Sequence, residues 1–551
     1  MMFCVSIQRR LSDRQLYNLF GSFSISKTSC RRHLSISTRP EQKRDYAAAI
    51  VALNTLQSNF AVVAAVRKGK EMNKLAIPEM IDWCRKAGYE PSDFDLLKPI
   101  HISGTKGKGS TSAFISSILA QYSPTSSPTH GQPSKIGLYT SPHLRFVRER
   151  IQINNVPISE EKFAKYFFEV WDRLEAASGV DGLPRGPTTK PAYFRYLTLM
   201  ALHAYICEGV DTAVIECGIG GEYDSTNVLV KPVVTAVTSL GVDHADMLGD
   251  TVSETAWHKA GIFKNGGLAF SAPQKDDAVK VLEDRAIERN TKLHFVDIHP
   301  SLANDEVKLG LSASFQKVNA SVAIAVAAAH LRALGHTSIP DPTSTEHITL
   351  PPEFIRGLEQ VHWPGRCEIR REENVAWHID GGHTLESIEI AGKWFAEQIE
   401  SVTSSTPTAS GLPPRILIFN QQTRDASALA RALYATLQAG MAPGASSPFS
   451  HVIFTTNQTF SAGYRPDLVS INTNQQDVDA LSVQKELAKT WSEIDPTAHV
   501  SVVKTIEESI ASARTIAQDW ATLSKGEIEV MALITGSLHL VGGALEVLET
   551  I

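Results

Sequence analysis

The sequence lacks long hydrophobic runs and has few cysteines, and each shortage excludes a class of protein. Its most tempting apolar stretch, residues 47–66, is interrupted by asparagine, glutamine and serine, so no segment predicts a membrane-spanning helix. The six cysteines form no CxxC pair and have no regular spacing. They are typical of reduced thiols in an intracellular protein, so neither a disulfide framework nor a zinc framework is expected.

The chain also lacks an excess of positive charge, except at its start. The net charge is −6 at pH 7, and no basic stripe with interleaved aromatic residues occurs, which argues against a nucleic-acid partner. Residues 1–40, however, hold seven arginines and lysines, many serines and one acidic residue. This composition is typical of a mitochondrial transit peptide, with a disordered basic tail as the alternative. We therefore expect the protein in the mitochondrion, in the matrix or at the inner membrane, with the cytoplasm as a second location.

The length of 551 residues and the order of segment types predict two α/β domains. Helical patterns alternate with short apolar runs such as 211–216, which indicates a mostly parallel sheet covered on both faces. Prolines and a Trp-Pro-Gly sequence interrupt this pattern between residues 351 and 365. We place the boundary there, with an N-terminal domain at 41–357 and a smaller C-terminal domain at 358–551.

The second half of the chain continues the alternation, and no internal repeat is evident. Helical segments, among them 505–520, separate apolar runs that predict strands. The predicted strands are 375–380, 415–420, 451–456, 500–505 and 529–535. Loops rich in Ser, Pro or Gly are predicted at 123–134, 179–190 and 401–414.

The most informative local pattern is a strand, a turn of glycines and lysines, and a helix within residues 98–122. Such a turn directs backbone N–H groups and the positive end of the helix at one point, where they bind phosphate, and Lys108 adds a mobile charge. The match to a P-loop is imperfect, because Ile102 stands at the first glycine position and Gly109 follows the lysine. The metal-binding hydroxyl would then come from Ser110. An ordinary glycine-rich turn with a surface lysine is the alternative.

Three polar residues at predicted strand ends are candidate Mg²⁺ ligands: Ser141, Glu216 and His244. The carboxyl ends of neighbouring parallel strands converge on one crevice, which brings such side chains together. Singly, the serine could cap a turn, the glutamate could belong to a buried ion pair, and the histidine could be an ordinary loop residue. Together with a phosphate loop, the three favour a divalent cation.

Longer motifs extend over nearly all of the chain after residue 40. They lie at 54–59, 104–110, 141–143, 148–150, 193–198, 216–227, 241–244, 248–252, 257–264, 362–366, 379–384 and 535–538. On these motifs, which occur in the family's order, the chain resembles the folylpolyglutamate synthases of the eukaryotic, fungal type, relatives of the bacterial cell-wall Mur ligases. Two departures, Gly382 for the common alanine and Cys217 for the common valine, remove no functional group.

The resemblance implies a fold and a role for each motif residue. The fold would be a Mur-ligase-like ATPase domain with the P-loop, followed by a smaller Rossmann-like α/β domain. The implied ATP-binding residues are Gly104, Thr105, Lys106, Gly107, Gly109, Ser110, Gln316, Asn319 and Arg366, of which Gln316 and Asn319 would contact adenine. The implied catalytic residues are Lys108, Asp380 and His383, and the implied metal ligands are Ser141, Glu216, His244 and Lys259. Lys259 matches a lysine that relatives carry as a carbamate, whereas an unmodified Lys259 could bind a substrate carboxylate.

The activity implied by the resemblance is ATP-dependent addition of γ-linked glutamate to tetrahydrofolate and its polyglutamates, which retains folate for one-carbon metabolism. A carboxylate has no leaving group, so ATP would first transfer its γ-phosphoryl group to give an acyl phosphate. Lys108, Arg366 and Mg²⁺ would offset the repulsion between the anions, and K⁺ is a further candidate cofactor. Closure of the second domain would exclude water. The implied partners are a reduced folate, L-glutamate and ATP, bound by a monomer.

Two other functions stay open. Dihydrofolate synthase activity would use the same scaffold to join glutamate to a pteroate. A P-loop module that binds ATP without ligation belongs to a different class. Such a module would not need a second α/β domain with Asp380 and His383.

Overall fold

The computed structural model describes residues 43–57, 74–123, 133–178, 189–344, 349–405, 413–422, 425–441, 447–461, 467, 480–524 and 529–550. From Arg44 onward, the described residues belong to one compact unit. The predicted transit segment at 1–40 lies outside the described residues. So do residues 58 and 59 of the first motif and large parts of the three predicted loops.

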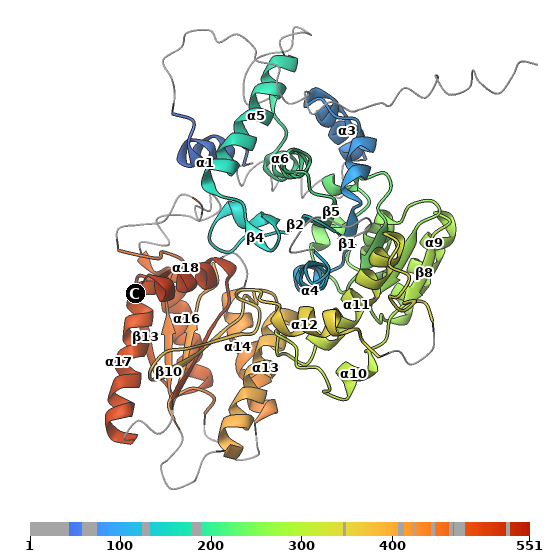
Figure 1. The fold of residues 1–551 in the computed structure, drawn as a ribbon. Coiled ribbons are helices and arrows are strands. Elements are labelled where there is room, and N and C mark those ends of the chain that lie inside the picture. Colours follow the sequence, from blue (N-terminus) through green and yellow to red (C-terminus); the bar gives the residue numbers. More distant parts are fainter. Residues whose placement is uncertain are drawn as a thin grey trace, which may run out of the picture. The chain divides into compact units, whose positions relative to one another are not determined.

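The first α/β part of the chain contains an eight-stranded sheet (Figure 1). Its strands are β1 (Ile100–Ser103), β2 (Ile136–Tyr139), β3 (Ile151–Ile153), β4 (Val156–Pro157), β5 (Thr212–Glu216), β6 (Val234–Val237), β7 (Leu268–Ser271) and β8 (Lys292–Phe295). Their order in the sheet is β4-β3-β2-β5-β1-β6-β7-β8. In this spatial order, each adjacent pair of strands from β2 through β5, β1, β6 and β7 to β8 is parallel. The strand β3 is antiparallel to both β2 and β4.

Helices cover both faces of this sheet. They are α1 (Tyr46–Asn54), α3 (Ala76–Lys86), α4 (Lys108–Ala120), α5 (Glu160–Ser178), α6 (Tyr193–Glu208), α7 (Ala245–Leu248), α8 (Val252–Lys259), α9 (Asp276–Glu288), α10 (Pro300–Ala303), α11 (Gln316–Ala333) and α12 (Pro352–Gln360). In β5, Val214 belongs to the core with α4, α11 and α12, whereas Ala213 and Ile215 belong to the core with α1, α3, α5 and α6. Successive strand residues therefore face opposite layers, as the two-residue period requires.

The second α/β part contains a six-stranded sheet in the order β13-β12-β11-β14-β10-β9. Its strands are β9 (Glu368–Arg371), β10 (Val375–Ile379), β11 (Arg415–Phe419), β12 (His451–Phe454), β13 (His499–Val502) and β14 (Val530–Thr535), and its helices are α13 (Leu385–Ser405), α14 (Ala426–Gly440), α16 (Ser482–Ile494), α17 (Ile506–Ser524) and α18 (Leu538–Glu549). Only β9 runs antiparallel to its neighbour. Leu417 and Phe419 face α13, α14 and α16, whereas Ile416 and Ile418 face α17 and α18.

The structure confirms the predicted α/β class in both parts and differs from the prediction in several details. The hairpin β3–β4 and the antiparallel strand β9 were not predicted. The loop predicted at 401–414 begins later, because α13 continues to Ser405. The predicted boundary between residues 357 and 358 falls inside α12, whose Gly357 packs against the backbone of Ile118 in α4.

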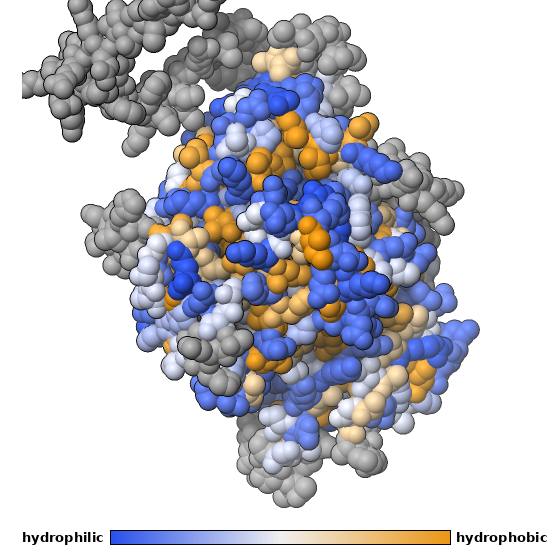
Figure 2. Space-filling model, turned by 90° about the vertical axis from the view of Figure 1, so that its right-hand side faces the viewer, coloured by the Kyte–Doolittle hydropathy of each residue, from blue (hydrophilic) through white to orange (hydrophobic). Residues whose placement is uncertain are grey.

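Among the described residues, no helix has both the length and the apolar character needed to cross a membrane. On the face of the molecule shown in Figure 2, hydrophobic side chains are interspersed with hydrophilic ones. Scattered apolar residues of this kind are ordinary on protein surfaces.

Candidate active site

A cavity of about 700 Å³ is lined by residues from both α/β parts. The first part contributes the loop between β1 and α4 and the segments that follow β2, β5 and β6. The second part contributes residues around 363–387 and Leu538 at the start of α18. Every predicted site residue except Gly104 and Asn319 lines this cavity.

The phosphate loop, residues 104–110, requires glycine at two positions. Gly104 has a φ of 144° and Gly107 a φ of 88°, values that glycine adopts without strain. A Cβ atom on Gly104 would lie 1.9 Å from Oγ1 of Thr238, and one on Gly107 would lie 2.2 Å from Oδ1 of Asn319. Neighbouring side chains therefore approach the loop too closely for a larger residue at either position.

The helix α4 begins at Lys108, directly after the loop. The first backbone N–H groups of a helix have no partner within the helix and carry partial positive charge. Nζ of Lys108 donates to the carbonyl of Gly104 at 3.0 Å, so its ammonium group lies back over the loop. The helix end and the lysine thus place positive charge at one wall of the cavity, an arrangement that binds phosphate.

Two amide side chains from α11 support the loop. Nε2 of Gln316 donates to Oγ of Ser110 at 3.3 Å, and Nδ2 of Asn319 donates to Oε1 of Gln316 at 2.8 Å. Both amides are buried. Gln316 lines the cavity, whereas Asn319 lies against Gly107. In this arrangement the pair braces the phosphate loop, and the contact with adenine stays a prediction.

Glu216 ends β5 in the cavity wall and is only 3% exposed. Burial raises the pKa of its carboxyl group, and the positive charge of Lys108 opposes that shift. The backbone N–H of Ser141 donates to Oε2 at 3.1 Å. A buried carboxylate at a cavity wall has further lone pairs that can bind a cation.

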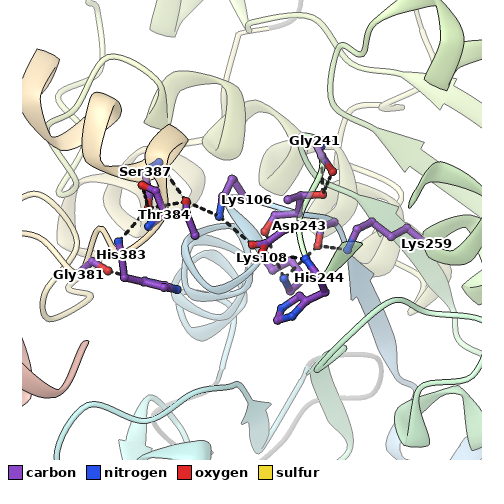
Figure 3. A network of polar contacts seen from close by, with 12 residues as sticks. Lys106, Lys108, Gly241, Asp243, His244, Lys259, Gly381, His383, Thr384 and Ser387 are labelled. Carbon is purple, nitrogen blue, oxygen red and sulfur yellow. Dashed lines mark hydrogen bonds and ion pairs between the residues drawn. The ribbon is translucent and has the colours of Figure 1, made fainter. Parts of the chain in front are cut away.

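The donor set fits a divalent cation best at Glu216 and Ser141. A carboxylate and a hydroxyl oxygen are ligands that Mg²⁺ accepts, and both residues line the cavity with Lys108. His244 lines it as well, exposed and with a φ of 54°, where α7 begins. Figure 3 shows its imidazole pointing away from Lys259.

Lys259, at the end of α8, is 4% exposed, and its Nζ donates to the carbonyl of Gly104 at 2.7 Å. Burial lowers the pKa of this amine to about 7, with the charge of Lys108 acting in the same direction. A protonated amine repels a cation, whereas a partly neutral one can react with carbon dioxide. The carbamate on Lys259 and the potassium ion stay predictions.

Three of the predicted site residues face the cavity from the second part: Arg366, Asp380 and His383. Asp380 accepts hydrogen bonds from the backbone N–H groups of Cys367 at 3.0 Å and Gly382 at 2.8 Å. Burial raises the pKa of its carboxyl group, and Arg366 opposes that shift. The Nδ1 atom of His383 lies 2.8 Å from the carbonyl of Gly381. Because a carbonyl only accepts, the proton is on Nδ1, and Nε2 is the acceptor atom of the neutral ring.

Lys106 connects the two walls of the cavity (Figure 3). Its Nζ donates to Oδ2 of Asp243 at 3.0 Å and to Oγ1 of Thr384 at 3.2 Å. Asp243 follows β6 of the first sheet, whereas Thr384 precedes α13 of the second part. The sequence predicted that Lys106 binds nucleotide, and the structure adds this bridge.

Sequence reasoning assigned no role to several residues of the cavity wall, and three of them are Arg150, Asp224 and Trp363. Nε of Arg150 donates to Nδ1 of His143 at 2.9 Å. Asp224 accepts from two backbone N–H groups at the turn after β5. The indole Nε1 of Trp363 packs on Gly109. Each of the three belongs to a motif of the family resemblance, which was the signal that could have identified it.

Comparison with known proteins gives consistent results. No family model matches the chain. The folylpolyglutamate synthase of Neurospora crassa is 46% identical over 530 residues, which cover 95% of this chain and 96% of that protein.

Two solved structures have a similar fold. The folylpolyglutamate synthase of Mycobacterium tuberculosis in complex with ADP has a TM-score of 0.63 at 20% identity, over 92% of this chain and 99% of that chain. An FPGS–AMPPCP–folate complex has a TM-score of 0.57 at 20% identity, over 92% of this chain and 100% of that chain. The two-part α/β architecture is therefore shared along nearly the whole length.

Proposed function

The chain belongs to the folylpolyglutamate synthase family, and from this we infer that it is an ATP-dependent ligase that joins glutamate to folate. One observation of the structure carries this function. A single cavity collects a phosphate loop, a buried carboxylate at a strand end, and Arg366, Asp380 and His383 from the second part. A module that only binds ATP has no need of the last three residues.

The reaction has to make an acyl donor from a carboxylate. We propose that the γ-carboxylate of tetrahydrofolate attacks the γ-phosphorus of ATP, which forms an acyl phosphate and releases ADP. The amine of glutamate then attacks the acyl carbon, phosphate leaves, and the nitrogen loses a proton. The products are the γ-linked amide, ADP and phosphate.

Positive charge from the chain supports the first step. The phosphoryl group moves between two anions, so their repulsion is the main obstacle. Lys108 and the N-terminus of α4 act from one wall, and Arg366 acts from the other. Fixed charges of this kind stabilise the charge that develops on the transferring group. When bound at Glu216 and Ser141, Mg²⁺ would supply further positive charge to the phosphate oxygens.

Proton removal in the second step falls to His383. Its Nε2 is the acceptor atom of the ring, and the hydrogen bond from Nδ1 to the carbonyl of Gly381 holds the ring in place. Asp380 acts as a positioning residue. It binds the backbone of Cys367, next to Arg366, and of Gly382, next to His383. One carboxylate therefore ties together the two backbone segments that carry Arg366 and His383.

The test is to incubate the purified protein with tetrahydrofolate, labelled glutamate and MgATP and to size the folate products. We expect label in lengthened folates, and ADP release that depends on both folate and glutamate. Lys108→Ala should lower the rate by at least ~100-fold. A parallel incubation with dihydropteroate measures dihydrofolate synthase activity. A rate of ATP hydrolysis that does not depend on folate or glutamate would contradict ligase activity.

We also propose import into mitochondria, on the basis of the basic, serine-rich composition of residues 1–40. Fusion of these residues to a fluorescent protein is expected to direct it to mitochondria. A fusion that stays in the cytoplasm would overturn the proposal. The monomeric state stays a prediction, which light scattering on the purified chain tests.

A further inference from the structure

A cluster of metal-ligating side chains lies on α5 and α6, outside the cavity. Nε2 of His203 is 2.8 Å from Oε2 of Glu169, and Sγ of Cys207 is 3.8 Å from both ring nitrogens. One ligand atom from each residue lies within 4.8 Å of the others. None of the three lines the cavity. His203 lies ten residues beyond Tyr193 of the cavity wall, roughly 15 Å along the helix axis.

The cluster follows from the helical period. His203 and Cys207 are four residues apart on α6, so their side chains share one face of the helix. Glu169 reaches them from α5, which packs beside α6 through the rings of Phe167 and Tyr196. The side chain of His203 is fully buried, whereas that of Glu169 is 35% exposed. An ion can therefore enter from solvent past Glu169 and reach a ring that packing holds in place.

We propose that Glu169, His203 and Cys207 bind a thiophilic divalent cation, Zn²⁺, with water as the fourth ligand. Zinc binds sulfur at about 2.3 Å and nitrogen or oxygen at about 2.0–2.1 Å, with tetrahedral geometry. These lengths place sulfur and nitrogen about 3.6 Å apart. Because Sγ of Cys207 lies 3.8 Å from both ring nitrogens, its side chain has to rotate toward Nε2 to bind the same ion. Nitrogen and oxygen require about 3.3 Å, so Glu169 has to withdraw by about 0.5 Å, which its partly exposed side chain permits.

Tyr89 supplies the outer partner that a metal-bound histidine needs. Its hydroxyl is 2.6 Å from Nδ1 of His203. Without metal, Nε2–H donates to Glu169 and the phenol donates to Nδ1. With metal on Nε2, the ring proton moves to Nδ1 and is donated to the phenol oxygen. Binding then releases one proton, that of the Cys207 thiol.

The charges also match this cation. The Glu169 carboxylate and the Cys207 thiolate together neutralise both charges of Zn²⁺. The hydrogen bond from His203 lowers the pKa of the Glu169 carboxyl group, and Lys165 and Arg173, one turn to either side on α5, act in the same direction. Mg²⁺ prefers oxygen ligands and a thiolate selects softer metals. The cluster therefore discriminates against the cation expected in the cavity.

Cobalt(II) is the probe for this site, because a cobalt–thiolate bond gives a charge-transfer absorption that oxygen and nitrogen ligands do not. The full chain is titrated with Co²⁺ in excess Mg²⁺. We expect one equivalent to produce the thiolate band and one equivalent of Zn²⁺ to remove it. Cys207→Ala should abolish the band, and Cys84→Ala, at a buried cysteine of α3, should retain it.

A second variant keeps the proposal testable if Cys207→Ala does not fold. Glu169→Gln removes an oxygen ligand at a partly exposed position and should weaken Zn²⁺ binding by about ten-fold or more, measured by competition with a chromophoric chelator. Absence of the thiolate band in the wild type, its persistence in Cys207→Ala, or unchanged Zn²⁺ affinity in Glu169→Gln would each overturn the proposal.

Discussion

Burial disfavours the charged form of several titratable side chains in the cavity. Burial raises the pKa of Glu216 and Asp380 and lowers the pKa of Lys259. In each case the ionised form costs stability in the fold. Charged substrates and the proposed cation would offset this cost on binding, so we expect the free site to be less stable than the occupied one.

Replacement of Glu216 by glutamine separates its catalytic effect from its structural effect. A carboxyl group with a raised folded-state pKa lowers stability above its unfolded-state pKa, because the fold disfavours the charge. Glutamine carries no charge, so we expect Glu216→Gln to unfold at the same temperature as the wild type or higher. Turnover should fall on the order of 100-fold, because an anionic ligand is lost.

Initial rates at saturating ATP and thermal unfolding followed by circular dichroism measure the two effects of Glu216→Gln. Glu283→Gln, on the exposed face of α9, controls for loss of a carboxylate and should keep full turnover. Near-normal turnover in Glu216→Gln would remove this residue from the metal site.

Lys259 predicts a pH dependence of stability. Its pKa falls from 10.5 to about 7 in the fold, so the unfolded chain binds more protons between these pH values and stability rises with pH there. Lys259→Met lacks this group. The free energy of unfolding of the wild type should therefore increase relative to that of the variant as the pH rises from about 7 toward 10.5. Urea unfolding at several pH values measures the difference. A constant difference, equal to that for the exposed Lys280→Met, would contradict the buried amine.

At the scale of elements, the sequence predicted what buried periodicity controls. The strands β5, β10 and β14 are buried at every residue and mostly apolar, so the sequence predicted their positions directly. The strand β9 was missed because it lies at an edge and carries Glu368, Arg370 and Arg371, charges that an edge strand tolerates. The hairpin β3–β4 was missed because its strands are only three and two residues long.

The sequence likewise predicted some features of the candidate site and missed others. Convergence of strand ends correctly brought Ser141 and Glu216 to one cavity, since the parallel order of β2 and β5 guarantees it. The bridge from Lys106 to Thr384 joins residues 278 positions apart, and no local pattern encodes such a contact. The approach of Asn319 to Gly107 likewise depends on how α11 packs on α4.

The contact between α11 and the phosphate loop predicts an energetic coupling. Gly107→Ala places a Cβ atom 2.2 Å from Oδ1 of Asn319, so we expect lower stability and weaker ATP binding. Asn319→Ala removes the obstructing atom but also the brace. In the double variant the loss should be smaller than the sum of the single losses, because room is made for the new methyl group. The remaining strain of the positive φ is about 1–2 kcal/mol.

Unfolding free energies of the two single variants and the double variant form a double-mutant cycle that measures this coupling. Gly335→Ala, also at positive φ but with open space around the new Cβ, isolates the backbone strain. Strictly additive losses for Gly107→Ala and Asn319→Ala would contradict a direct contact.

At the scale of the whole described chain, function depends on contacts between the two α/β parts. The loop after β2, which carries Ser141, packs on α18 of the second part. The carbonyl of Leu144 lies 2.0 Å from where a Cβ of Gly542 would be, and Arg145 forms ion pairs with Glu546 and Glu549. The same contacts therefore influence how Arg366 and His383 lie relative to the phosphate loop.

Substitutions at two neighbouring glycines of α18 distinguish the contact between the two parts from packing within the second part. A Cβ on Gly542 meets Leu144 of the first part, whereas one on Gly543 lies 2.4 Å from Cδ1 of Ile506 within the second part. We expect Gly542→Ala to displace the two walls of the cavity and lower kcat by roughly 10- to 100-fold, since small misplacements of reacting groups are costly. Gly543→Ala should instead lower the unfolding temperature and keep kcat below that temperature, because its strain stays inside one core. Steady-state rates and calorimetry on both variants compare the effects. If both variants lost stability equally and kept kcat, the contact between Leu144 and α18 would have no part in aligning the site.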